Sequence, residues 1–205
     1  MKLAVGASRM SLLRLRRRLI IARRGHKLLK DKQEELMRQI LTLIDDIRTH
    51  RQKVESELFA ALVRFRLAQN TFDPKYVESA LILPKREINL TIRTKNILNV
   101  KVPVLEKIMT GDIRCYGFLG TSGELDFALQ SLNNLLDSLL LLAEKEKTLE
   151  LLADEMEKTR RRVNALEFIL IPNIEETIKF IVLKLTETER SDLTRLMRVK
   201  ELIRG

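Results

Sequence analysis

Two long stretches of apolar residues at helical spacing flank a middle stretch that holds most of the helix-breaking residues. Three of the four prolines and four of the seven glycines lie between Pro74 and Gly123. Because proline and glycine disfavour helix interiors, long helices are expected only outside this stretch. We therefore expect one structural unit with three parts: an N-terminal coiled-coil helix over 1–70, a connector with a short helix and a β-hairpin over 71–123, and a C-terminal coiled-coil helix over 124–205.

The segment before the connector has apolar residues at steps of three and four, which is the a and d spacing of a coiled-coil seam. The residues expected on this first seam are Leu12, Leu15, Leu19, Ala22, Leu29, Leu36, Ile40, Leu43, Ile47 and Val54. After Val54 the apolar positions shift to Leu58, Leu62 and Phe65, as a local stutter in the heptads would produce. A helix of about 60 residues is longer than a compact domain of this size needs, so the pattern favours an elongated coiled coil.

The segment after the connector carries a second seam of the same kind. The residues expected on it are Ala128, Leu132, Leu135, Leu139, Leu142, Leu149, Met156, Val163, Leu166, Leu170, Ile174, Ile178, Ile181, Leu185, Leu196 and Val199. Pro172 interrupts this seam, and proline removes a backbone donor and clashes with the preceding turn. We expect a kink or a short break in the helix at that point.

The middle stretch has a different pattern. Polar and apolar residues alternate from Glu87 to Arg93, as in a half-buried strand. Residues 98–105 are a second candidate strand, in which Pro103 indicates an edge position or a bend, and residues 114–118 are a third. These patterns predict a small hairpin region in the connector.

Neither seam can remain exposed to water, and the short connector allows the chain to turn back on itself. The sequence therefore predicts a mainly α fold, in which a long two-helix antiparallel coiled coil carries a small β-hairpin-bearing middle region. Both chain termini are then expected at the end opposite the connector.

The net charge of +10 is concentrated at the N-terminus. Residues 1–30 contain ten basic side chains and no acidic one, so basic and acidic residues balance in the rest of the chain. Such a block favours contact with a polyanion or an acidic protein surface, although a solvated helix face remains an alternative. Nucleic acid is a weaker choice of partner, because residues 1–58 contain no Phe, Tyr or Trp on which bases could stack.

In an antiparallel hairpin, the basic block would lie beside the C-terminal residues, which carry a small surplus of positive charge. The candidate contact residues of this basic tip are Arg9, Arg14, Arg16, Arg17, Arg18, Arg23, Arg24, Lys27, Arg195 and Arg198. A basic coiled coil that binds nucleic acid and a cytoplasmic coiled-coil tether stay open as alternative functions.

The residues that usually carry chemistry do not form a motif. Cys115 is the single cysteine, which excludes an internal disulfide and makes an intracellular location the default. His26 and His50 lie far apart in sequence, and no Gly-Lys-Ser/Thr follows the glycines at 117, 120 and 123. The longest apolar runs have about five residues, far fewer than a membrane span requires. We therefore expect no catalytic, cofactor-binding or metal-binding residue and no insertion into a membrane.

Two stretches of this sequence resemble a known family. They are residues 25–38, GHKLLKDKQEELMR, and residues 157–167, EKTRRRVNALE, followed by Ile171-Pro172. Both are similar, in the same order, to the D subunits of the V-type ATP synthases, and the resemblance extends over nearly the whole chain.

The resemblance implies a central-stalk rotor subunit without an active site or a cofactor. Members of that family are long antiparallel coiled coils whose terminal helices enter a hexamer of A and B subunits. They bind the F subunit and rest on the subunit that caps the membrane ring, and they carry torque between H⁺ or Na⁺ flow and ATP synthesis or hydrolysis. The implied location is the cytoplasm, peripheral to the inner face of the membrane, and no nucleic acid is implied.

Overall fold

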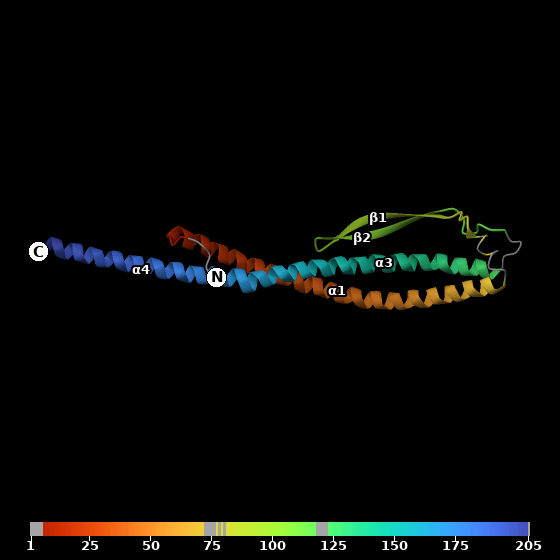
Figure 1. Ribbon diagram of the computed structural model, residues 1–205, viewed down its shortest axis with the longest axis horizontal. Coiled ribbons are helices and arrows are strands. Elements are labelled where there is room, and N and C mark those ends of the chain that lie inside the picture. Colours follow the sequence, from red (N-terminus) through yellow and green to blue (C-terminus); the bar gives the residue numbers. More distant parts are fainter. Residues whose placement is uncertain (1–5, 72–76, 78, 80, 118–122, 205) are drawn as a thin grey trace. The chain divides into compact units, whose positions relative to one another are not determined.

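The computed structural model describes residues 6–71, 77, 79, 81–117 and 123–204. Its elements are helix α1 (Arg9–Thr71), strands β1 (Glu87–Ile97) and β2 (Val100–Thr110), helix α3 (Gly123–Asn164), the π-helix η1 (Ala165–Leu170) and helix α4 (Ile171–Arg204) (Figure 1). The fold is mainly α with a β-hairpin in the middle of the chain, which confirms the predicted class. Between α1 and β1, the described residues Val77, Ser79 and Leu81 are also helical.

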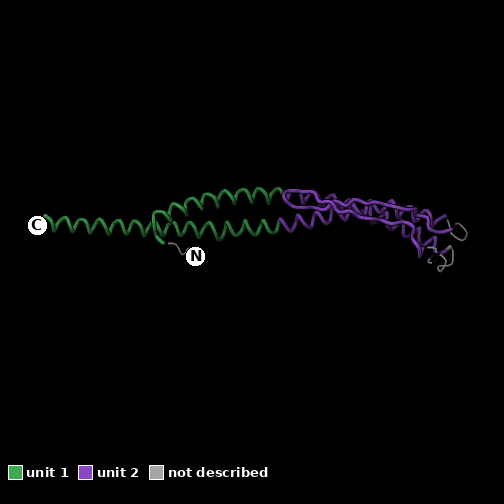
Figure 2. Tube along the Cα trace, turned by 90° about the horizontal axis from the view of Figure 1, so that it is seen from above, with its two compact units in different colours: residues 1–35, 156–205 green, residues 36–155 purple. Residues whose placement is uncertain are grey.

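The chain forms two compact units, which Figure 2 shows in different colours. We call residues 1–35 and 156–205 the terminal unit, and residues 36–155 the hairpin unit. Each unit contains part of α1 and part of the later helical segment.

In the terminal unit, α1 packs antiparallel to η1 and α4. Arg9 pairs with Glu189 and Arg23 pairs with Glu175, so the partner's number falls as the number along α1 rises. The buried centre consists of Leu15, Ile174 and Ile181, against which Leu12, Leu19, Leu170, Ile178 and Leu185 pack. Burying each of the three central side chains contributes roughly 2 kcal/mol.

The hairpin unit repeats this arrangement with α1 and α3. The Nζ of Lys145 lies 3.8 Å from a carboxylate oxygen of Asp46, and Arg64 donates a hydrogen bond to Ser131 at 3.1 Å. At the end near the connector, a second core consists of Ala68, Val77 and Leu125, with Phe65, Leu81, Tyr116 and Leu129 packed against it. The Tyr116 hydroxyl donates to Asp126 at 2.5 Å, and burial, reinforced by this hydrogen bond, raises the pKa of Tyr116.

The buried residues of α1 follow the heptad of a coiled coil. They are Leu15, Ala22, Leu36, Ile40, Ile47, Val54, Ala61 and Ala68, spaced by multiples of seven except for one step of four after Leu36. The expected shift to Leu62 is wrong, because Leu62 is 49% exposed whereas Ala61 is 1% exposed. Near the connector the seam therefore keeps its phase and uses small alanines. Leu58 and Phe65, the other two expected positions, are half-buried, whereas Phe59, Leu62, Val63 and Leu67 are exposed.

Three threonines occupy buried positions of the later helices. The hydroxyls of Thr148 and Thr177 donate to the carbonyls of Glu144 and Asn173, four residues earlier in their own helices. The buried Thr159 hydroxyl has no hydrogen-bond partner in the described part of the chain. The second seam is thus more polar than its leucines and isoleucines predict.

The chain responds to Pro172 by a change of helix type. The Ile171 N–H bonds to the carbonyl of Leu166, five residues earlier, which is the bond of a π-helix. The proline ring crowds the carbonyl four residues before it, and the wider π turn relieves this contact. The expected kink or break is therefore replaced by η1, after which α4 continues directly.

The hairpin closes with a two-residue turn at Leu98 and Asn99. Both residues have positive φ values, 50° and 67°, as a type I′ turn requires. The strands pair antiparallel from Glu87 opposite Thr110 to Ile97 opposite Val100. Each strand is longer than predicted, and the second begins at residue 100 because residue 98 belongs to the turn. The predicted third strand is wrong for residues 114–117, which belong to no strand; residue 118 lies outside the described residues.

Two glycines allow opposite predictions for substitution by alanine. A Cβ at Gly25, within α1, would meet no atom within 4 Å. Gly25→Ala should therefore raise the free energy of unfolding by about 1 kcal/mol, because alanine favours the helix. Gly111 has φ +93°, and a Cβ there would lie 2.1 Å from the carbonyl oxygen of Lys85.

Gly111→Ala should therefore destabilise the base of the hairpin. Urea unfolding followed by circular dichroism measures the effect of Gly25→Ala on stability, and amide exchange in β1 and β2 measures that of Gly111→Ala. A destabilising Gly25→Ala would show that another part of the protein approaches α1 closely there.

Candidate protein-binding surface

The ten basic residues proposed from the sequence all belong to the terminal unit, and all are exposed. Three form ion pairs: Arg9 with Glu189 at 2.7 Å, Arg23 with Glu175 at 2.7 Å and Arg195 with Asp192 at 4.0 Å. The others have no ion pair with a described residue; they are Arg14, Arg16, Arg17, Arg18, Arg24, Lys27 and Arg198. Most of this positive charge is therefore available to a partner.

Exposed apolar residues accompany these cations on α1. They are Met10, Leu13, Ile20, Ile21 and Leu28. Met10 and Leu13 line a groove of about 290 Å³ with Arg14 and Arg17. A second groove, of about 360 Å³, has Leu12 and Leu13 beside Arg9, Arg16, Val182, Leu185, Thr186 and Glu189. This surface can therefore contact a partner through apolar side chains as well as through charge.

These apolar residues were not singled out in the sequence, because they lie beside the seam and share its composition. Leu13, Ile20 and Ile21 fall between the seam positions Leu12, Leu15 and Ala22. The sequence feature that indicates them is an excess of large aliphatic residues outside the a and d positions of the heptad.

The C-terminal end of α4 adds further exposed apolar residues. Arg9 at the start of α1 pairs with Glu189, so the residues after Glu189 have no α1 partner within the described residues of the terminal unit. Leu196 and Val199 were expected on the seam, and this is wrong because both are exposed. The exposed apolar residues here are Leu193, Leu196, Met197, Val199, Leu202 and Ile203.

The seam residues proposed as structural contacts have different burial. Those that are buried are Leu15, Leu36, Ile40, Val163 and Ile181. Those that are half-buried are Leu12, Leu19, Leu43, Met156 and Leu185. Leu139 is 38% exposed, whereas Leu135, one turn earlier, is 2% exposed.

On α1, the ring of His26 is half-buried and lies 3.3 Å from a carboxylate oxygen of Glu167 in η1.

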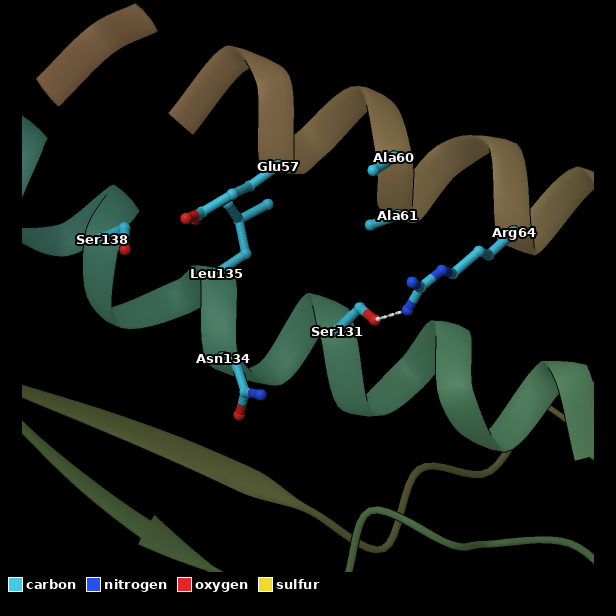
Figure 3. Close-up of a pocket in the computed structure, with 8 residues that line it drawn as sticks. All are labelled: Glu57, Ala60, Ala61, Arg64, Ser131, Asn134, Leu135 and Ser138. Atoms are coloured by element: carbon cyan, nitrogen blue, oxygen red, sulfur yellow. Dashed lines mark hydrogen bonds between the residues drawn. The ribbon is translucent and has the colours of Figure 1, made fainter. Parts of the chain in front are cut away.

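A groove between α1 and α3 in the hairpin unit arises from small side chains. It has a volume of about 350 Å³ and is lined by Glu57, Ala60, Ala61, Arg64, Ser131, Asn134, Leu135 and Ser138 (Figure 3). Arg64 is held by its hydrogen bond to Ser131, and Asn134 points away from α1. The lining contains neither a nucleophile–base pair nor two facing carboxylates, so the groove indicates loose packing rather than a reaction site.

We also searched the described residues for metal sites and membrane-spanning helices. Within the described ranges, no group of three or more His, Cys, Asp or Glu side chains is placed to hold a metal ion. Among the helices of these ranges, none combines the length and the apolar character that crossing a membrane requires.

Comparison with known proteins extends over almost the whole chain. The family model for the ATP synthase D subunit matches residues 11–201. The V-type ATP synthase D subunit of Fusobacterium nucleatum is 51% identical over 205 residues, which cover 98% of this chain and 97% of the relative.

Two further relatives agree. The V-type ATP synthase D subunit of Acetivibrio thermocellus is 50% identical, with 97% of this chain and 91% of the relative covered. That of a Thermoanaerobacter species is 46% identical, with 97% and 96% covered. With a match of this length and identity, the chain belongs to the D-subunit family of the V-type ATP synthases.

Proposed function

We propose that this chain is the central-stalk rotor subunit of a rotary V-type ATP synthase. In this role it transmits torque between a membrane ring that translocates H⁺ or Na⁺ and a catalytic hexamer of A and B subunits. The observation that carries the proposal is the full-length similarity to the D subunits of V-type ATP synthases. The same similarity does not favour a nucleic-acid-binding coiled coil or an isolated tether.

The proposed partners are the A and B subunits, the F subunit and the subunit that caps the membrane ring. The proposed location is the cytoplasmic side of the membrane, where the chain is held by its partners. Chemistry takes place in the hexamer, and this chain contributes no catalytic residue.

The surface of the terminal unit supports a position inside the hexamer. Its cations that have no ion pair with a described residue, which include Arg16, Arg17 and Arg18, would meet acidic or carbonyl groups of the surrounding subunits. Exposed apolar residues of α1 and α4, such as Leu13 and Leu196, would pack against an apolar part of the same lining. A rotor must occupy several equivalent orientations, and long-range attraction with broad apolar contact suits this better than a few bidentate pairs.

The proposal is tested by reconstitution with A and B subunits of the same organism. The hexamer should hydrolyse ATP in a sustained manner with this chain bound, whereas the purified chain alone should show no hydrolysis. Size-exclusion chromatography and a coupled ATPase assay measure both results. ATP turnover by the chain alone that persists through stringent purification, or failure to bind the hexamer, would contradict the proposal.

Neutralising the three consecutive arginines should weaken binding to the hexamer. With roughly 0.5 kcal/mol for each exposed charge, the variant Arg16→Gln, Arg17→Gln, Arg18→Gln should bind about tenfold less tightly at low salt. Each single substitution should have little effect. Since salt screens exposed charges, the difference from the unmodified chain should shrink as ionic strength rises.

The matched control removes the same charge from the hairpin unit, by Arg48→Gln, Lys53→Gln and Arg66→Gln. These side chains are also exposed and have no described ion pair. Affinity for the hexamer, measured across a salt series, should be unchanged by the control. Equal losses for both triple variants would show that the position of the charge does not matter, and an affinity that ignores both salt and the first triple variant would show that apolar packing alone holds the terminal unit.

A further inference from the structure

The hairpin has one covered edge and one free edge. On β2, the Leu105 N–H donates to a carboxylate oxygen of Glu144 at 3.3 Å, and Lys107 forms an ion pair with Asp137. Both acidic residues belong to α3, so this helix lies along the outer edge of β2. The sheet has only two strands within the described residues, and β1 therefore has no strand on its other side (Figure 1).

The register identifies the backbone groups at the free edge. In an antiparallel pair, alternate residues direct their N–H and C=O groups toward and away from the neighbouring strand. Leu105 donates away from β1, and Pro103, which has no N–H, occupies the same kind of position two residues earlier. The two-residue turn makes Ile97 and Val100 a hydrogen-bonded pair. Counting from this pair, Leu105 and Pro103 again direct their backbone groups away from β1.

It follows that alternate residues of β1 present their backbone groups to the free edge. They are Ile88, Leu90, Ile92, Thr94 and Asn96. No hydrogen bond joins these N–H and C=O groups to another described part of the chain. An 11-residue strand with such an edge is a ready template for another strand.

The side chains at this edge show what kind of strand fits. Ile88, Leu90 and Ile92 are 45%, 51% and 66% exposed, and they lie on one face of the sheet because they alternate along β1. Nearer the turn, Lys95 and Lys101 are exposed and have no described ion-pair partner. The edge thus offers a row of apolar side chains on one face of the sheet. Nearer the turn, on the opposite face, it offers the positive charge of Lys95, which has no ion pair with a described residue.

We propose that the free edge of β1 binds an extended segment of a neighbouring subunit of the ATPase complex by strand addition. The segment has apolar side chains beside Ile88, Leu90 and Ile92 and an acidic side chain near Lys95. A second copy of this chain fits less well, because its β1 would bring Arg93 and Lys95 but only one acidic side chain, Glu87. The inference rests on the proposed function, since it takes the partner from the assembled complex.

Residue-resolved amide exchange on the isolated chain and on the reconstituted complex tests this inference. On assembly, exchange at Ile88, Leu90, Ile92 and Thr94 should slow by about tenfold or more. The residues between them already bond to β2 and should change less. This alternation separates strand addition from simple burial of the hairpin, which would slow neighbouring amides alike.

Charge variants test the stated chemistry of the segment. Lys95→Glu should restore faster exchange of the outward amides in the complex, because it repels an acidic strand. Lys101→Glu is the matched control: it makes the same charge change in the same hairpin but on β2, so it should leave the protection unchanged. In the isolated variants, slow exchange of the β1 amides that bond to β2 shows that the hairpin is still folded.

Three outcomes overturn the inference. If the chain joins the complex but the β1 amides at the free edge exchange as fast as in the isolated chain, strand addition is wrong and the proposed function stands. A chain that does not join the complex overturns the proposed function as well. Protection that appears in the isolated chain and rises with its concentration would make a second copy the occupant of the edge.

Discussion

The structure depends on the burial of a narrow apolar seam between α1 and the helices that follow the hairpin. A 63-residue helix has no interior of its own, so its apolar stripe must find a second helix. Within each unit, α1 runs antiparallel to its partner, and an ion pair joins the two helices: Arg9–Glu189 in the terminal unit and Asp46–Lys145 in the hairpin unit. Exposed pairs of this kind contribute little energy, so the seam provides the stability and the pairs report its alignment.

The sequence predicted the helices, the hairpin and most of α1's seam, because heptad spacing and strand alternation are local signals. It failed where the choice depends on the partner helix. Ala61 and Ala68 are buried and Leu62 is not, since the heptad phase set by Ile40 and Val54 outweighs side-chain size. The buried Thr159 and the exposed Leu196 depend likewise on what lies opposite. The π turn before Pro172 is a local response to the proline ring, and helix propensity does not specify which form that response takes.

The candidate binding surface was only half visible in the sequence. Arginines stand out as charge, whereas Leu13 and Ile21 are hidden among the aliphatic residues that every coiled coil contains. The free edge of β1 could not be predicted from the sequence. Identifying it requires two structural observations: Leu105 and Pro103 show which residues of each strand face away from the hairpin, and α3 covers the outer edge of β2. In both places the proposed contacts are made by residues that the fold leaves exposed rather than by those that it buries.

A rotor subunit must turn relative to the hexamer that surrounds it, and single-molecule rotation tests this most directly. A bead attached beside the hairpin turn through the exposed position Lys101→Cys, with Cys115 replaced by serine, would report motion while the hexamer is fixed to a surface. We expect rotation in one direction when ATP is added, and none without ATP. A bead that stays still on complexes that hydrolyse ATP would contradict the account.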